Sequence, residues 1–296
     1  NMAGNTASSL GRHNVELRLN AETRGISAKG GDPFVLTIYF SGTGNSRYIA
    51  RRFSQVMQGE CLSIEDQADF SVRMRAHTRL AVCYPIHNGG VPRIMREFAA
   101  AYRDDFRGKQ MILLCTQMLS SCDGACAFTD LFPDNWFTVI YADHFLMPGN
   151  LCNILPSWTY GPRLTQWEKE RANAKIHRIE QHLRQHRVRQ RGSGPVSRLL
   201  GTWRRQNQYS DAAASRGNVH VGPECSGCGT CAGQCPAGNL VLNGHGPVMA
   251  NNNCMHCYRC VNLCPQKAIT GLSTGRLSIN ILALILDRAV LYGGSV

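Results

Sequence analysis

The sequence lacks any apolar run long enough to cross a membrane. Its longest strongly apolar run, residues 281–286, is far shorter than the roughly 20 residues that a membrane-spanning helix needs. The chain also shows no basic start that leads into an apolar stretch and a small-residue cleavage site, which is the pattern of a secretory signal. These absences predict a cytoplasmic protein with no membrane span.

Acidic residues are scarce relative to basic ones. The chain has 20 Asp and Glu against 32 Lys and Arg, for a formal net charge of +12. Much of the excess lies in the segment 171–205, where a solvated helix face, a docking surface for an acidic redox partner and a nucleic-acid site are the alternatives. Little aromatic character accompanies these charges beyond Trp203 and Tyr209. We therefore rank nucleic acid last and expect no nucleic-acid partner.

The first part of the chain changes character at residue 34. Residues 1–33 are polar and rich in Gly, Ser and Asn, which predicts a disordered or tag-like lead-in. Apolar, β-branched strand segments then alternate with amphipathic helical stretches, and this alternation predicts an α/β, doubly wound, five-stranded parallel sheet over 34–191. The strand segments are FVLTIYFS from Phe34, CLSI from Cys61, RLAVCYPI from Arg79, KQMILLCTQ from Lys109 and WFTVIYADHFLM from Trp136.

The remaining chain divides by composition into three parts. Residues 192–218 are polar, basic and weakly patterned, which favours a basic linker after the GSGP break. A cysteine-dense domain occupies 219–275. The apolar segment 276–296 is expected to form a C-terminal helix that packs on the rest of the chain, with a dimer seam or a membrane surface as alternatives.

Cysteine, in contrast, is abundant: the chain has fourteen, and eight of them form a doubled motif. Each half reads C-x2-C-x2-C-x3-C-P, the bacterial spacing for [4Fe–4S] clusters, in which the fourth cysteine ligates the neighbouring cluster. Zinc knuckles or a disulfide cluster are the alternatives, but a zinc site needs no proline after its last cysteine. The predicted ligand sets are Cys225, Cys228, Cys231 and Cys264 for one cluster, and Cys235, Cys254, Cys257 and Cys260 for the other.

A glycine-containing loop, FSGTGNS, joins the first predicted strand to the first predicted helix. Such a loop presents backbone N–H groups and the positive end of the helix dipole, which suits phosphate. It has neither the lysine of a P-loop nor the glycine spacing of dinucleotide-binding folds, so a phosphate monoester fits it better than a triphosphate. The candidate phosphate-binding residues are Ser41, Gly42, Thr43, Gly44, Asn45 and Ser46.

This loop resembles the phosphate loop of flavodoxins, and with the doubled cysteine motif the chain is similar to flavodoxin–ferredoxin fusion proteins of anaerobic bacteria and archaea. The resemblance covers about 34–275. It implies a flavodoxin-like domain, a small α+β ferredoxin-like domain, FMN and two [4Fe–4S] clusters, with the flavin ring at the ends of the third and fourth strands. The implied ring contacts are Pro85, Ile86, His87, Asn88, Gly89, Gly90, Thr116, Gln117 and Met118.

Several other residues near the expected flavin have two interpretations. Cys115, Cys122 and Cys126 match no ligand motif, so buried packing is favoured over a redox-active thiol. The loop that carries them departs from the glycine-rich pattern usual in the family. His87 could donate a proton to a reduced substrate, although packing against the ring edge is favoured because a lone histidine carries little information.

The two cofactors together predict the function. FMN exchanges one or two electrons and [4Fe–4S] clusters exchange one, so a chain with both is expected to be an electron carrier or converter that serves a redox partner protein. The alternative is an FMN-dependent reductase of a small-molecule electron acceptor, fed by the clusters, with His87, Asn88, Cys122 and Tyr141 as candidates. A nucleic-acid-binding iron–sulfur protein has only charge in its favour.

Overall fold

The structure is a computed structural model, and it describes residues 35–87, 89–118, 121–149, 162–214, 219–242, 247–249 and 253–271. These residues all belong to one compact unit, Phe34–Val296. The predicted lead-in and C-terminal helix lie outside the described residues, as does Asn88. In the part of the chain that is described, no helix combines the length and the apolar character that crossing a membrane requires.

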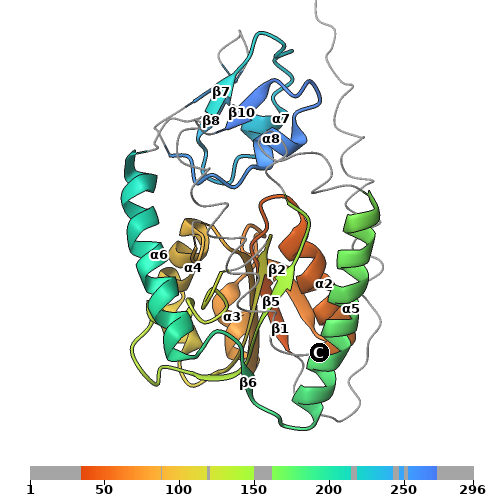
Figure 1. The fold of residues 1–296 in the computed structure, drawn as a ribbon, viewed down its shortest axis with the longest axis vertical. Coiled ribbons are helices and arrows are strands. Elements are labelled where there is room, and N and C mark those ends of the chain that lie inside the picture. Colours follow the sequence, from red (N-terminus) through yellow and green to blue (C-terminus); the bar gives the residue numbers. More distant parts are fainter. Residues whose placement is uncertain are drawn as a thin grey trace, which may run out of the picture. The chain divides into compact units, whose positions relative to one another are not determined.

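A parallel sheet of six strands forms the larger part of the described chain (Figure 1). Its strand order, β2-β1-β3-β4-β5-β6, reverses direction between β1 and β3, as in doubly wound folds. The prediction of a doubly wound parallel sheet is therefore confirmed, with a short sixth strand added at the edge beside β5. The strands are β1 (Leu36–Tyr39), β2 (Glu60–Ser63), β3 (Arg79–Pro85), β4 (Gln110–Gln117), β5 (Thr138–Leu146) and β6 (Arg189–Gln190).

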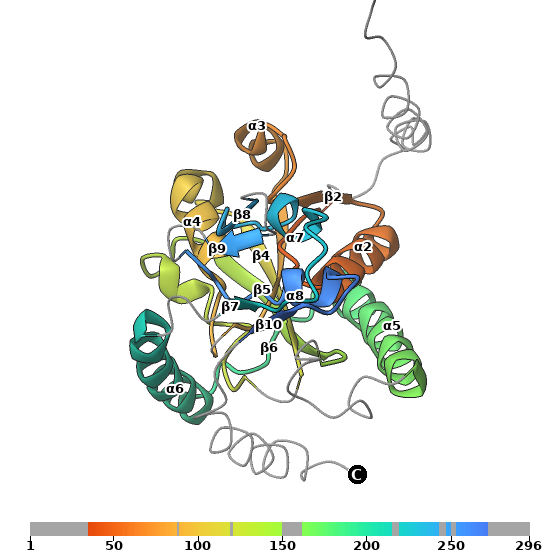
Figure 2. The same cartoon turned by 90° about the horizontal axis from the view of Figure 1, so that it is seen from above.

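Helices cover both faces of this sheet. In Figure 2, α2 (Asn45–Met57) and α5 (Pro162–Arg184) lie on one side, and α3 (Phe70–Arg75) and α4 (Arg93–Ala101) lie on the other. The apolar stripe that the sequence predicted on α5, formed by Ile176, Ile179 and Leu183, is buried against the sheet. Two short 3-10 helices, η1 (Arg103–Phe106) and η2 (Thr129–Leu131), complete this part.

The continuous apolar run at β1 has a direct structural reason. All four residues of the strand are buried. Because side chains alternate across a strand, Leu36 and Ile38 enter the core on the α3–α4 side, whereas Val35 and Tyr39 enter the core on the α2–α5 side. A strand that is covered on both faces needs apolar residues at consecutive positions, and this explains why the run does not alternate.

The cysteine-dense part forms two antiparallel strand pairs and two short helices. Strand β7 (Val219–Val221) pairs with β10 (Ile269–Gly271), and β8 (Leu240–Leu242) pairs with β9 (Pro247–Met249). Helices α7 (Thr230–Gly233) and α8 (Arg259–Leu263) lie within the two cysteine runs, and each contains the third cysteine of its run. Its small core contains Cys231, Leu240, Tyr258, Val261 and Ile269.

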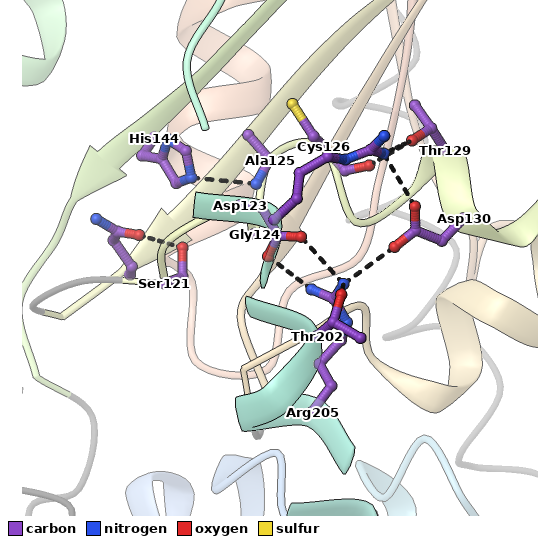
Figure 3. Close-up of polar contacts among 12 residues, drawn as sticks. Ser121, Asp123, Gly124, Ala125, Cys126, Thr129, Asp130, His144, Thr202 and Arg205 are labelled. Carbon is purple, nitrogen blue, oxygen red and sulfur yellow. Dashed lines mark hydrogen bonds and ion pairs between the residues drawn. The ribbon is translucent and has the colours of Figure 1, made fainter. Parts of the chain in front are cut away.

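The segment that the sequence predicted as a basic linker contains a helix, α6 (Pro195–Ala214). The helix is anchored by an ion pair rather than by an apolar stripe. Arg205 donates to both carboxylate oxygens of Asp123, at 2.6 and 3.0 Å, and to Asp130 at 3.0 Å (Figure 3). Gly201 faces the same aspartate so closely that any Cβ there would clash with it. The sequence pattern missed this helix because its anchor lies about eighty residues away in the chain.

The Arg205–Asp123 pair makes a stability prediction. The two side chains are only 11% and 1% exposed, so Arg205→Ala would leave a buried, unpaired carboxylate. We expect a loss of about 3 kcal/mol and a fall in melting temperature on the order of 10 °C, measured by circular dichroism.

The matched control for that measurement is Arg198→Ala. Arg198 also pairs with Asp130, but both side chains of this pair are about half exposed, at 48% and 44%. A surface pair of this kind contributes about 0 to 1 kcal/mol, so the melting temperature should change little. Equal shifts in the two variants would contradict the assignment of Arg205 as the anchor of α6.

Candidate functional site

The predicted phosphate loop lies at the carboxyl end of β1 and ends in the N-cap of α2. Gly44 is that N-cap, and its φ of 108° is in the region that favours glycine. Its N–H donates to Ser41 Oγ at 3.0 Å, which closes the loop. Within the described residues no side chain caps α2, and its first turn has no acidic residue. The N-terminus of this thirteen-residue helix is therefore suited to an anion.

The ends of β3 and β4 lie beside this loop, as the sequence predicted. Ser46 and Thr116 share a buried hydrogen bond between their hydroxyl oxygens at 2.7 Å, and Pro85 pairs with Thr116 in the sheet. The N–H of Ile86 donates to the carbonyl oxygen of Thr116 at 2.9 Å. Because Ser46 bonds to Thr116, its hydroxyl links the loop to β4. A role for these residues in binding a flavin stays a prediction.

His87 and Gly90 form a tight turn directly after β3. Each backbone N–H donates to the carbonyl oxygen of the other residue, at 3.1 and 2.9 Å, and Gly89 has a φ of 74°. The His87 ring packs edge-on against Phe40 at 6.2 Å between centroids. Burial, with a smaller contribution from His256, lowers the pKa of His87 to about 4. The imidazole is therefore neutral near pH 7, which favours packing over proton donation.

The loop after β4 is fixed by contacts from several elements. The Tyr84 hydroxyl donates to the Gly124 carbonyl oxygen at 2.7 Å, and the Ala125 N–H donates to His144 Nε2 at 3.2 Å. Gln117 accepts a hydrogen bond from the N–H of Met147 at its carbonyl oxygen. Figure 3 shows the part of this loop that approaches α6.

The three cysteines of this region are buried. Burial raises the pKa of Cys126 to about 11 and that of Cys115 well above its usual value, so both thiols are protonated near pH 7. Cys122 is 9% exposed. A protonated, buried thiol is a poor nucleophile, which supports packing as the role of this group.

The eight cysteines of the doubled motif line two separate cavities. Cys235, Cys254, Cys257 and Cys260 line one cavity, and Cys225, Cys228, Cys231 and Cys264 line the other. These are the two sets that the spacing predicted. Among the described residues, no three His, Cys, Asp or Glu side chains could hold a metal ion together. The structure thus sorts the eight thiols into two sets of four, and their binding of iron–sulfur clusters stays a prediction from the spacing.

Backbone N–H groups point at four of these sulfur atoms. Gly227 donates to Cys225 Sγ and His256 donates to Cys254 Sγ, each at 3.4 Å. Asn239 donates to Cys235 Sγ and Ala268 donates to Cys264 Sγ, each at 3.3 Å. Hydrogen bonds of this kind stabilise the negative charge of a thiolate ligand, so the backbone also fits a cluster.

The two cysteine runs repeat the same backbone conformation. Positive φ angles occur at Gly227, Gly229 and Gly238 in the first run, and at His256, Tyr258 and Lys267 in the second. The first, second and third residues of the two sets correspond, because each stands at the same sequence offset from the equivalent cysteine of its run. Non-glycine residues with positive φ are uncommon and cost conformational energy. Their presence at equivalent positions indicates that both runs must turn in the same way around their cavities.

Family models identify both parts of the chain. A model described as a flavodoxin domain matches residues 36–137. A model described as a 4Fe-4S dicluster domain matches residues 224–269. The chain joins a flavodoxin domain to a 4Fe-4S dicluster domain. The two domains support the binding of FMN and of iron–sulfur clusters, and a role in electron transfer. No curated protein gives a significant match.

Solved structures resemble the flavodoxin domain at low sequence identity. A flavodoxin, WrbA-like protein from Agrobacterium tumefaciens is 13% identical, with 53% of this chain and 100% of that chain covered and a TM-score of 0.38. A flavodoxin from the domain Archaea is 11% identical, with coverages of 49% and 98% and a TM-score of 0.31. A flavoprotein in complex with FMN from Lactobacillus acidophilus NCFM is 12% identical, with coverages of 38% and 93% and a TM-score of 0.31.

The dicluster domain packs directly on the predicted phosphate loop of the flavodoxin domain. A Cβ added to Gly42 would lie 2.5 Å from the carbonyl oxygen of Cys257. Met255 and Cys257 join the apolar core on the α3–α4 side of the sheet. At a second point, Arg93 donates to the side chain and the carbonyl oxygen of Asn253, at 2.7 and 3.0 Å. One set of predicted cluster ligands therefore adjoins the predicted flavin site.

The Gly42–Cys257 contact predicts the effect of one methyl group. In Gly42→Ala the added carbon meets backbone, which cannot rotate away, so we expect the domains to separate locally at a cost of about 1–3 kcal/mol. Hydrogen exchange in the peptide that covers residues 253–263 should become about tenfold faster or more, measured by mass spectrometry on flavin-free protein.

Gly194→Ala is the matched control for this exchange measurement. A Cβ at Gly194 would have no heavy atom within 4 Å, so this variant should exchange like the wild type. If the 253–263 peptide of Gly42→Ala exchanged at the control rate, that result would contradict the close packing of Gly42 on Cys257 between the two domains.

Proposed function

We propose that this protein transfers electrons within one chain, between FMN on the flavodoxin domain and two [4Fe–4S] clusters on the dicluster domain. The observation that carries the proposal is the packing of Cys257, a predicted cluster ligand, on Gly42 of the phosphate loop. Electron transfer between two cofactors requires them to lie close together, and this contact supports a short separation. The resulting activity is that of a redox carrier or converter.

The proposed roles of the residues follow from their positions. Residues 41–46 hold the FMN phosphate through the N-terminus of α2. Residues 85–90 and 116–118 flank the flavin ring. The four cysteines that line each cavity bind one cluster there. When bound, FMN supplies one- or two-electron chemistry, and the clusters supply single-electron chemistry.

The exposure of the cysteines supports an order for the transfer. Cys228 is exposed, whereas Cys257 is buried against the flavodoxin domain. We therefore assign Cys225, Cys228, Cys231 and Cys264 to an outer cluster that meets a redox partner protein. The set that contains Cys257 holds an inner cluster, which lies between the outer cluster and the flavin.

The reductase alternative needs an acid beside the flavin. His87 is the histidine among the four candidates that the sequence offers, and its lowered pKa of about 4 makes it a weak source of protons near pH 7. The role that suits a neutral, buried imidazole is packing or hydrogen bonding at the edge of the ring. We therefore retain electron transfer as the proposed function.

The proposal predicts the composition of protein purified or reconstituted without oxygen. We expect about eight iron and eight sulfide per chain, as for two four-iron clusters, with one releasable FMN. Cys228→Ala and Cys257→Ala should each lose about half of the iron, and Cys257→Ala should also slow the reduction of the flavin by a reduced ferredoxin. Iron analysis, absorbance and stopped-flow spectra give these values.

Cys126→Ala is the control, because this cysteine lines neither cavity. It should keep the iron content of the wild type. Colourless protein that carries zinc in place of iron would contradict the proposed function. Steady flavin oxidation by an added small molecule, abolished in His87→Ala, would favour the reductase instead.

A further inference from the structure

The guanidinium group of Arg259, in the dicluster domain, donates hydrogen bonds to two carbonyl oxygens of the phosphate loop. Its Nη2 donates to the carbonyl oxygen of Ser41 at 2.7 Å, and its Nε donates to that of Gly42 at 3.1 Å. The same group forms two parallel bonds to the carboxylate of Glu65, at 2.7 and 2.6 Å. A further bond to the carbonyl oxygen of Gln234 lies at 3.2 Å. The side chain is only 13% exposed.

These bonds fix the direction of the loop's peptide groups. In a trans peptide, the carbonyl oxygen of one residue and the N–H of the next point in opposite directions in one plane. Holding the carbonyl oxygens of Ser41 and Gly42 toward Arg259 therefore turns the N–H groups of Gly42 and Thr43 away from it. Arg259 thereby sets the orientation of the two peptide groups that lead into the N-terminus of α2.

The pairing of Arg259 with Glu65 holds the guanidinium in place behind the loop. Because the Glu65 carboxylate offsets the charge of the guanidinium, the contribution of Arg259 to the site is the orientation of the loop. A preformed loop loses less conformational entropy when a ligand binds.

We propose that Arg259 completes the FMN phosphate site across the domain boundary, so that flavin affinity depends on the bonds of this one dicluster-domain residue to the loop. The inference rests on the proposed function in one respect, namely that FMN is the ligand of this loop. Arg259 is a positioning residue, because it orients the loop's donors and does not itself contact the ring.

The test is a flavin titration of protein that has been stripped of flavin and retains its clusters. In Arg259→Ala, we expect the Kd for FMN to rise about 10- to 100-fold, since two charge-assisted bonds to the loop are lost. Riboflavin, which has no phosphate, should bind to the variant and the wild type with similar affinity. Quenching of flavin fluorescence measures both constants, and iron content checks the clusters.

Two further variants make the outcome decisive. Arg93→Ala breaks a different polar contact between the same two domains but does not touch the loop, so its Kd for FMN should stay within about twofold of the wild type. Arg259→Lys keeps the charge and should fold even if the alanine variant does not. We expect it to weaken FMN binding at least fivefold, because one ammonium cannot reproduce the planar set of bonds.

The outcomes separate this inference from the proposed function. An unchanged Kd for FMN in Arg259→Ala and Arg259→Lys, with clusters intact, overturns the role of Arg259 and leaves electron transfer standing. Equal losses for FMN and riboflavin, or an equal loss in Arg93→Ala, also overturn it, because the effect would then not act through the phosphate. Wild-type protein that binds no FMN overturns both proposals.

Discussion

The backbone contact between Gly42 and Cys257 is the constraint on which the arrangement of both domains depends. It requires a residue without a side chain at the carboxyl end of β1, at the edge where β3 and β4 also end. It also requires the second cysteine run to present its own backbone there, which the left-handed conformations at His256 and Tyr258 allow. Glycine at this position therefore serves the domain contact as well as the proposed phosphate site.

Much of the fold and of the cysteine sites could be predicted because the signals are local. Continuous apolar runs at β1 and β4 reflect burial on both faces of a parallel sheet, and the cysteine spacing fixes which thiols share a cavity. The equivalent turns of the two runs could also have been found by aligning Gly227 with His256. The glycine in the first run marks a conformation that the second run adopts without glycine.

The parts that sequence reasoning missed depend on distant partners. Helix α6 looks like a linker because its anchor is the pair between Arg205 and Asp123, and the composition of the helix does not reveal that pair. Arg259 lies between two predicted ligand cysteines, and nothing in the local sequence distinguishes it. Its partners on the predicted phosphate loop lie 217 and 218 positions away in the chain. The burial of His87, which lowers its pKa to about 4, likewise comes from neighbours that are distant in sequence.

The exposure of Cys228 in one of the two cysteine sets has a consequence for handling and survival in air. Dioxygen and chelators reach an iron site through solvent, and the exposed Cys228 opens the outer cavity to them, whereas the flavodoxin domain covers Cys257. Oxidative damage should therefore begin at the outer end and leave the inner iron in place for longer. Under the proposed function, a partly degraded preparation would then keep the half of its redox chain beside the proposed flavin site while losing the half proposed to meet a partner protein.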